Sequence, residues 1–130
     1  MANEEKVYEA FGELLYAIAR SEGKVKQATE EHVEMMLKKY TWGNEAIWSF
    51  KYEKKRKNSF EETYDHAIST FIEYGPFEEY KTFFELLDEI HQQKNSIFGE
   101  RGKKILSNFK KKLQRAFMEN ENITYEDDDE

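Results

Sequence analysis

The chain contains no cysteine and little proline or glycine, and these shortages exclude several classes of protein. One proline and six glycines among 130 residues are too few for an all-β protein with many tight turns. Without cysteine there is no disulfide scaffold, thiolate zinc site, iron–sulfur cluster or cysteine nucleophile, which fits a reducing compartment. No apolar run approaches the roughly 20 residues of a membrane-spanning helix, and the start, MANEEKVYEA, lacks the basic and apolar regions of a signal peptide. We therefore expect a cytoplasmic protein without membrane insertion.

Length and charge predict one domain followed by an acidic tail. A chain of 130 residues lies well below the roughly 250 residues at which single cores usually divide. The net charge is −7, and seven acids with no base lie in 119–130, so residues 1–118 are formally neutral. We expect a helical domain over 1–118 and a disordered tail over 119–130. The tail would either be solvated or fold back on the base-rich segment 101–115, and we favour the solvated state.

Apolar residues recur at helical spacing through most of the chain. The stripes lie within 7–18, 33–40, 46–50, 60–71, 77–90 and 105–117. Segment 44–57 is ambiguous, because Trp48, Phe50 and Tyr52 also alternate as in a strand, but no other segment could pair with such a strand. Ser59 and Glu62 have the spacing of a helix capping box. The pattern predicts an all-α, single-domain bundle of about six helices.

An internal repeat indicates that the bundle is built from two similar helical halves. A shift of 72 positions places residues 11–18 on 83–90, with five identities in eight columns. The match continues without a gap from Gly23 on Asn95 to Val25 on Ile97, so each half would be a long helix, a left-handed elbow, an apolar plug and a second helix. Part of the match is chance, because all amphipathic helices share one period.

The run from residue 11 to residue 25, FGELLYAIARSEGKV, resembles the signature of the TerB-like (tellurite resistance protein B-like) domains, whose first helix reads like LLYAIAxADGxV. The later WSFKY and GPFEEY segments are similar to the remainder of that pattern. The resemblance implies an all-α fold of two similar halves without catalytic activity. It also implies a role in tellurite or stress responses, through protein partners that include membrane-associated complexes and DnaJ-type chaperone systems.

The same resemblance implies a divalent-cation site at the elbow. TerB-like domains usually place Asp before the elbow glycine, whereas this chain has Glu22 in the first half and Lys94 in the second. Ca²⁺ and Mg²⁺ need several converging oxygen ligands, and a lysine amine supplies none. The candidate metal ligands are therefore Glu22, Glu30 and Glu31 of the first half. Solvated surface acids and acids at a helix start explain these three residues without a metal, and we favour that explanation.

Two carboxylates and a histidine form a candidate polar site inside the bundle. Glu13 and Glu85 occupy the same repeat position, so they would approach each other across an axis between the halves, and paired carboxylates raise one pKa. His91 flanks the buried stripe one turn after Leu87. The alternative, which we favour, is that both glutamates lie at the edges of their apolar stripes. No His, Ser or glycine-rich motif identifies a catalytic centre.

A cluster of basic and aromatic residues is the candidate partner-binding surface. It comprises Trp48, Tyr52, Lys54, Lys55, Arg56 and Lys57. Such a cluster would also suit nucleic acid, but the acidic tail would compete for the same cations, so we expect a protein partner and no nucleic acid. We predict a non-catalytic TerB-like interaction module. The alternative function is a small enzyme or ligand carrier that uses Glu13, Glu85 and His91.

Overall fold

The computed structural model describes residues 2–74, 79–92 and 100–121, and these ranges form six α-helices and no β-strand. The helices are α1 (Ala2–Ser21), α2 (Gln27–Leu37), α3 (Gly43–Arg56), α4 (Phe60–Tyr74), α5 (Glu79–Gln92) and α6 (Glu100–Glu121). This confirms the all-α bundle, and α3 confirms a helix where 44–57 was ambiguous. Within these ranges, no helix combines the length and the apolar character that crossing a bilayer requires.

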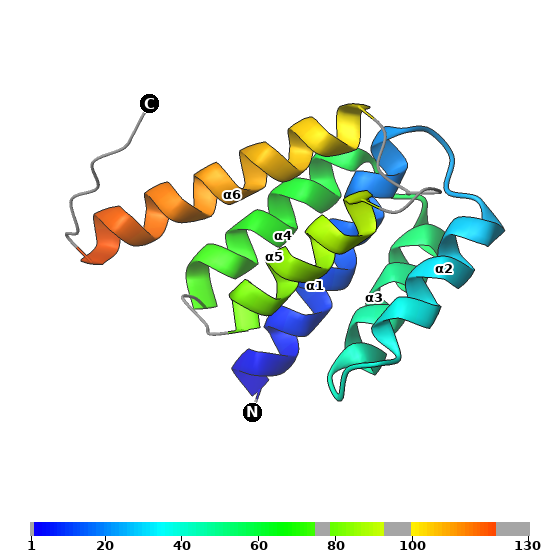
Figure 1. The fold of residues 1–130 in the computed structure, drawn as a ribbon, viewed down its shortest axis with the longest axis horizontal. Helices are drawn as coiled ribbons and strands as arrows, with labels where there is room; N and C mark the ends of the chain where they lie inside the picture. The colour runs from blue at the N-terminus through cyan, green and yellow to red at the C-terminus, as the bar shows by residue number, and fades with distance from the viewer. Residues whose placement is uncertain (1, 75–78, 93–99, 122–130) are drawn as a thin grey trace.

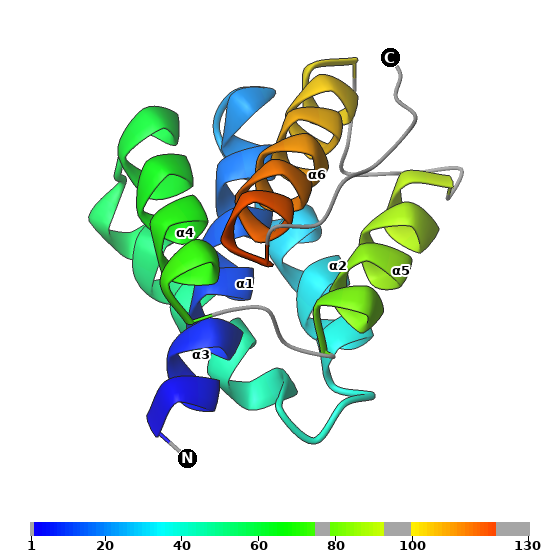
Figure 2. The same cartoon turned by 90° about the vertical axis from the view of Figure 1, so that its left-hand side faces the viewer.

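Helix α1 is the axis of the bundle. It packs against α3, α4 and α6, while α2 packs on α3 and α5 packs on α6. Figure 2 shows α1 in the middle, with α4 on one side and α2 and α5 on the other. Every residue from 14 to 19 is buried, so this part of α1 is covered on all faces. Helix α6 crosses the bundle, and its C-terminal end extends beyond the other helices (Figure 1).

Aromatic rings fill the centre of the core where α1, α4, α5 and α6 meet. The Phe11 and Phe83 rings stack with centroids 4.3 Å apart. Phe71 packs edge-on against Phe83 at 5.9 Å and against Phe109 at 5.1 Å. Each of these four side chains is fully buried, and truncating one such ring to alanine typically costs about 3–5 kcal/mol. This ring cluster ties the second half of the chain to α1.

A glycine sets the distance between α1 and α3. A Cβ atom on Gly12 would lie 2.2 Å from the carbonyl oxygen of Ala46 and 3.0 Å from the Cβ of Ser49. Only a residue without a side chain lets the two backbones approach this closely. The close approach of α1 and α3 places the side chains of both helices, together with those of α4, around one surface groove, which is described below.

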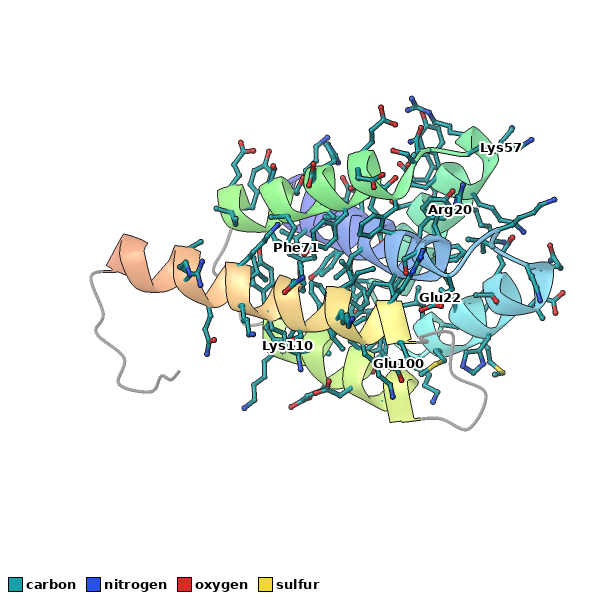
Figure 3. The ribbon with its side chains drawn as sticks, turned by 90° about the horizontal axis from the view of Figure 1, so that it is seen from above. Arg20, Glu22, Lys57, Phe71, Glu100 and Lys110 are labelled. Atoms are coloured by element: carbon teal, nitrogen blue, oxygen red, sulfur yellow. The ribbon has the colours of Figure 1, made fainter. Side chains whose placement is uncertain are left out.

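The first elbow follows α1 in the chain, and hydrogen bonds hold it against the start of α6. Gly23 has φ +122°, and Val25, the predicted plug, is buried. Glu22 Oε2 accepts a 3.0 Å hydrogen bond from the backbone N–H of Gly102, and Arg101 donates one to the carbonyl oxygen of Ser21. Glu22 therefore caps the first turn of α6, where a carboxylate is stabilised by the helix dipole. Figure 3 shows Glu22 beside this end of α6.

Two parts of the predicted organisation lie outside the described residues. The second elbow, with Asn95 and Ile97, falls in 93–99. Helix α6 continues to Glu121, past the expected domain limit at residue 118, and the remainder of the predicted tail, 122–130, is likewise not described.

Candidate functional site: the exposed face of α3 and the groove beside it

One face of α3 carries aromatic and basic side chains that are exposed to solvent. Helical spacing places five exposed residues in a row, which we call the α3 stripe: Trp48, Lys51, Tyr52, Lys55 and Arg56. The opposite face, with Ala46 and Phe50, is buried in the core. Trp48 is 58% exposed and Tyr52 is 42% exposed. Aromatic rings stabilise a protein most when they are buried. Two neighbouring rings that are exposed therefore mark a candidate interaction surface.

The side chains of the stripe already contact one another. The Trp48 and Tyr52 rings stack with centroids 5.2 Å apart and an interplanar angle of 10°. The Arg56 guanidinium carbon lies 5.4 Å from the Tyr52 ring centroid, and Arg56 Nη1 donates a 3.2 Å hydrogen bond to the Tyr52 hydroxyl. A partner would therefore meet an ordered ladder of two rings and one cation, which lowers the entropy lost on binding.

Four of the six predicted partner-binding residues lie on the α3 stripe, and the other two, Lys54 and Lys57, lie outside it. Trp48, Tyr52, Lys55 and Arg56 share the α3 stripe, which agrees with the predicted grouping. Lys54 points toward α2, where its Nζ lies 2.6 Å from Glu30 Oε1. Lys57 follows the end of α3 in a left-handed conformation, with φ 58° and ψ 39°. Grouping by sequence neighbourhood missed this division because consecutive helical residues are rotated by about 100°.

An open groove of about 420 Å³ lies beside the stripe, between α1, α3 and α4. We call it the acidic groove, and its lining residues are Glu13, Tyr52, Glu53, Arg56, Asn58, Glu62, Thr63 and His66. His66 Nδ1 lies 2.8 Å from Glu13 Oε1. Burial raises the pKa of the Glu13 carboxyl above its ordinary value of 4.5, although the bond to His66 acts in the opposite direction.

The floor of the acidic groove holds two buried polar side chains. Glu53 is only 6% exposed and accepts a hydrogen bond from Asn58 Nδ2. The Thr63 hydroxyl is buried and has no hydrogen-bond partner among the described residues. The groove is lined by three carboxylates, one histidine and one arginine, so its charge favours binding of a small cationic or polar group. An unpaired buried hydroxyl costs about 1–3 kcal/mol.

The predicted polar site of Glu13, Glu85 and His91 does not form as expected. Glu13 contacts His66, a residue that the sequence analysis left without a role, while Glu85 is exposed on α5. The side chain of His91 lies outside the described residues. The repeat position misled because residues 14–19 of α1 are covered on all faces, whereas α5 buries only a stripe that includes Phe83 and Leu87. Glu13 and His66 are 53 positions apart, and no local pattern joins them.

The three predicted metal ligands are engaged in three separate contacts. Glu22 caps α6, Glu30 pairs with Lys54, and Glu31 accepts a 3.4 Å hydrogen bond from Gln27 Nε2. In the part of the chain that the structure describes, no group of three or more His, Asp or Glu side chains is arranged to hold a metal ion. A cation at the first elbow would have to displace these contacts.

Comparisons with protein-family models, with curated proteins and with solved structures find no match to this chain. The TerB-like resemblance of residues 11–25 therefore stays a prediction. The function is inferred from the α3 stripe and the acidic groove.

Proposed function

We propose that this chain is a non-catalytic protein-interaction module whose partner docks on the α3 stripe. The observation that carries the proposal is the stacked, exposed pair Trp48 and Tyr52. Among the described residues, the large apolar side chains that are exposed are these two and Met35. Tryptophan, tyrosine and arginine are the side chains that most often dominate binding energy at protein interfaces. The stripe presents all three within two turns of one helix.

The charges of the stripe define the partner's chemistry. Lys51 is already paired with Glu34 at 3.2 Å, so Lys55 and Arg56 are the cations that face a partner. Opposite charge across an interface increases the association rate and selects the register of binding. The matching partner surface is an apolar side chain that covers the two rings, flanked by Asp or Glu.

Family membership is a further part of the proposal. We infer a TerB-like bundle of two similar halves, which would place the chain in a tellurite- or stress-associated system. In support, Phe11 and Phe83 are equivalent under the 72-residue shift, and their rings stack at 4.3 Å, as expected of equivalent residues at a two-fold axis. An NMR structure of the full chain tests this. Residues 11–37 should superpose on 83–109 by a rotation, and unlike shapes would contradict the assignment.

Weak divalent-cation binding is the least supported part of the TerB-like proposal. Calorimetric titration with Ca²⁺ and Mg²⁺ measures it, with Glu30→Gln as the variant. This variant removes one candidate ligand without touching the cap that Glu22 makes to Gly102. Heat in the wild type that disappears in the variant would support the site, and absence of heat in the wild type would remove it.

Quantitative affinity capture tests the docking surface. The immobilised full chain is compared with Trp48→Ala, with Arg56→Glu, and with Met35→Ala as the matched control. Met35 is 62% exposed on α2, so the control removes an equally accessible apolar side chain from another helix. We expect a partner whose retention falls at least tenfold in both stripe variants and is unchanged in the control. Equal retention by all four proteins would refute the proposal.

A second candidate function, a small enzyme or carrier of a small polar ligand, is favoured by the acidic groove. The observation is the Glu13–His66 pair in a groove that is also lined by Glu53, Glu62 and Thr63. NMR titration of the His66 ring signals with agmatine, a small dication, tests it. A saturable shift that Glu13→Gln abolishes would support ligand binding, and unmoved signals would exclude this ligand class.

A further inference from the structure

A second pocket lies at the end of the bundle where α1 and α3 both end. We call it the elbow pocket; it measures about 350 Å³ and is lined by Tyr16, Arg20, Lys24, Val25, Lys54 and Lys57. Figure 3 shows Arg20 and Lys57 at this end of the molecule. Four of the six lining residues are cations and none is an acid. The pocket contains no residue of the α3 stripe, so an inference from it stands independently of the proposed partner surface.

Most of this positive charge is unpaired. Lys54 is neutralised by Glu30 at 2.6 Å. Arg20, Lys24 and Lys57 form no ion pair with any carboxylate in the described parts of the chain. Arg20 lies beside the hydroxyl of buried Tyr16, which it also influences electrostatically. The cations therefore surround a concave space rather than a set of acidic partners.

Helix ends do not account for all of these cations. Each helix C-terminus carries about half a negative charge, so the ends of α1 and α3 together offset about one cation. Because Glu30 offsets Lys54 and the buried Glu53 carboxylate also acts on the Tyr16 hydroxyl, a surplus of about one to two positive charges remains around the pocket. Like charges held close together destabilise a fold unless an anion or solvent screens them. A surplus of positive charge suits a phosphate-type anion.

The backbone of Lys57 has a conformation that is unusual for a residue other than glycine. Among the described residues it is the one non-glycine residue with positive φ, and its N–H closes α3 by donating to the carbonyl oxygens of Glu53 and Lys54. Glycine makes the same backbone bonds without steric strain, whereas any other side chain is strained in this conformation. The lysine side chain is therefore not needed for the cap. What it adds is a cation at the rim of the elbow pocket.

We infer that the elbow pocket binds a small phosphate-type oxyanion, such as pyrophosphate or the phosphate group of a small metabolite. Arginine supplies a planar fork that matches two phosphate oxygens, and lysine supplies mobile point charges that follow them. The volume is at the lower end of ligand pockets, which are about 300–1,000 Å³, so a compact anion fits better than a large cofactor. Tyr16, which is only 2% exposed, lines the same pocket.

Isothermal titration of the full chain with inorganic pyrophosphate tests this inference. We expect saturable binding to the wild type that is about tenfold weaker in Arg20→Gln and in Lys24→Gln. Lys39→Gln is the matched control, because Lys39 is exposed and does not line the pocket. Hexaglutamate at equal concentration distinguishes an acidic peptide from a phosphate. No saturable binding, equal loss in the control, or equally tight binding of hexaglutamate would overturn the inference.

Lys57→Gly separates a binding role from a structural one. Because glycine relieves the left-handed strain, this variant should unfold at a higher temperature than the wild type, so loss of binding cannot come from a damaged fold. Its affinity for pyrophosphate should nevertheless fall about tenfold. An unchanged affinity would show that Lys57 does not contact the anion and would contradict the site as described.

Discussion

Replacing Gly12 with alanine should destabilise the fold strongly, although the same change in an ordinary helix stabilises it. At an unconstrained helical position, Gly→Ala gains about 1 kcal/mol of helix propensity. At residue 12 the new Cβ would lie 2.2 Å from the carbonyl oxygen of Ala46, and ordinary contact begins near 3.4 Å. Helices α1 and α3 must therefore separate by about 1 Å, a gap that forfeits a quarter to a half of each dispersion contact across the interface.

The expected cost follows from this displacement. Overpacking a core typically costs about 1–3 kcal/mol, and here the obstacle is backbone, which has no alternative rotamer. After the propensity gain is deducted, we expect a net destabilisation of about 2 kcal/mol. For a domain of this size that corresponds to a fall in Tm of about 7 °C.

Urea and thermal unfolding, followed by circular dichroism, measure the effect of Gly12→Ala. The double variant with Ala46→Gly is the control. Because the clash is with the backbone oxygen of residue 46 and not with its side chain, the second substitution should not rescue stability. A Gly12→Ala protein as stable as the wild type, or rescue by Ala46→Gly, would refute the close approach of α1 and α3.

Four further predictions concern buried and capping polar groups. Tyr64→Phe should leave stability unchanged or raise it by up to about 1 kcal/mol, since the Tyr64 hydroxyl is buried without a hydrogen bond among the described residues and burial raises its pKa to about 12. Tyr80→Phe should lower stability by about 1 kcal/mol, because it removes the 2.6 Å hydrogen bond to the carbonyl oxygen of Phe71; loss of equal size in both variants would contradict this assignment. Glu22→Ala should cost about 1 kcal/mol in urea unfolding by removing the cap of α6, and no change would show that the cap is not stabilising. Glu13→Gln should be more stable than the wild type at pH 7, because a raised carboxyl pKa means that the ionised form destabilises the fold. The difference should narrow as the pH falls through the raised pKa toward 4.5 and should be nearly gone below 4.5, and a difference independent of pH would contradict the raised pKa.

Features encoded by neighbouring residues were predictable from the sequence. Apolar periodicity located all six helices, and Ser59 caps the start of α4 as expected, although Glu62 bonds to the Ser59 side chain and not to its backbone N–H. The backbone N–H of Glu62 donates to Ser59 Oγ at 3.2 Å, and Ser59 Oγ donates to Glu62 Oε1 at 3.3 Å. The exposed pairing of Trp48 with Tyr52 also follows from spacing, because residues four apart share a helix face.

Features that depend on how the helices pack were not predictable in the same way. Periodicity assigns the same kind of stripe to α1 and α5, yet α1 packs against α3, α4 and α6 while α5 packs mainly on α6, so Glu13 and the exposed Glu85 have different surroundings. The contact of Glu13 with His66 joins two helices across 53 positions. The elbow pocket likewise needs three separate segments, and its cations reach it from α1, the elbow and the end of α3. Such groupings require the tertiary arrangement, since no local rule brings these residues together.

Site-specific photo-crosslinking in intact cells of the source organism tests the central claim most directly. A benzoylphenylalanine placed at position 48 reports what touches the α3 stripe, and the same residue at position 35 reports an equally exposed position on α2. We predict a discrete covalent adduct from position 48 that is absent from position 35 and that disappears when Arg56→Glu is added. Adducts of equal yield at both positions, or an adduct indifferent to Arg56→Glu, would contradict a partner bound on this face.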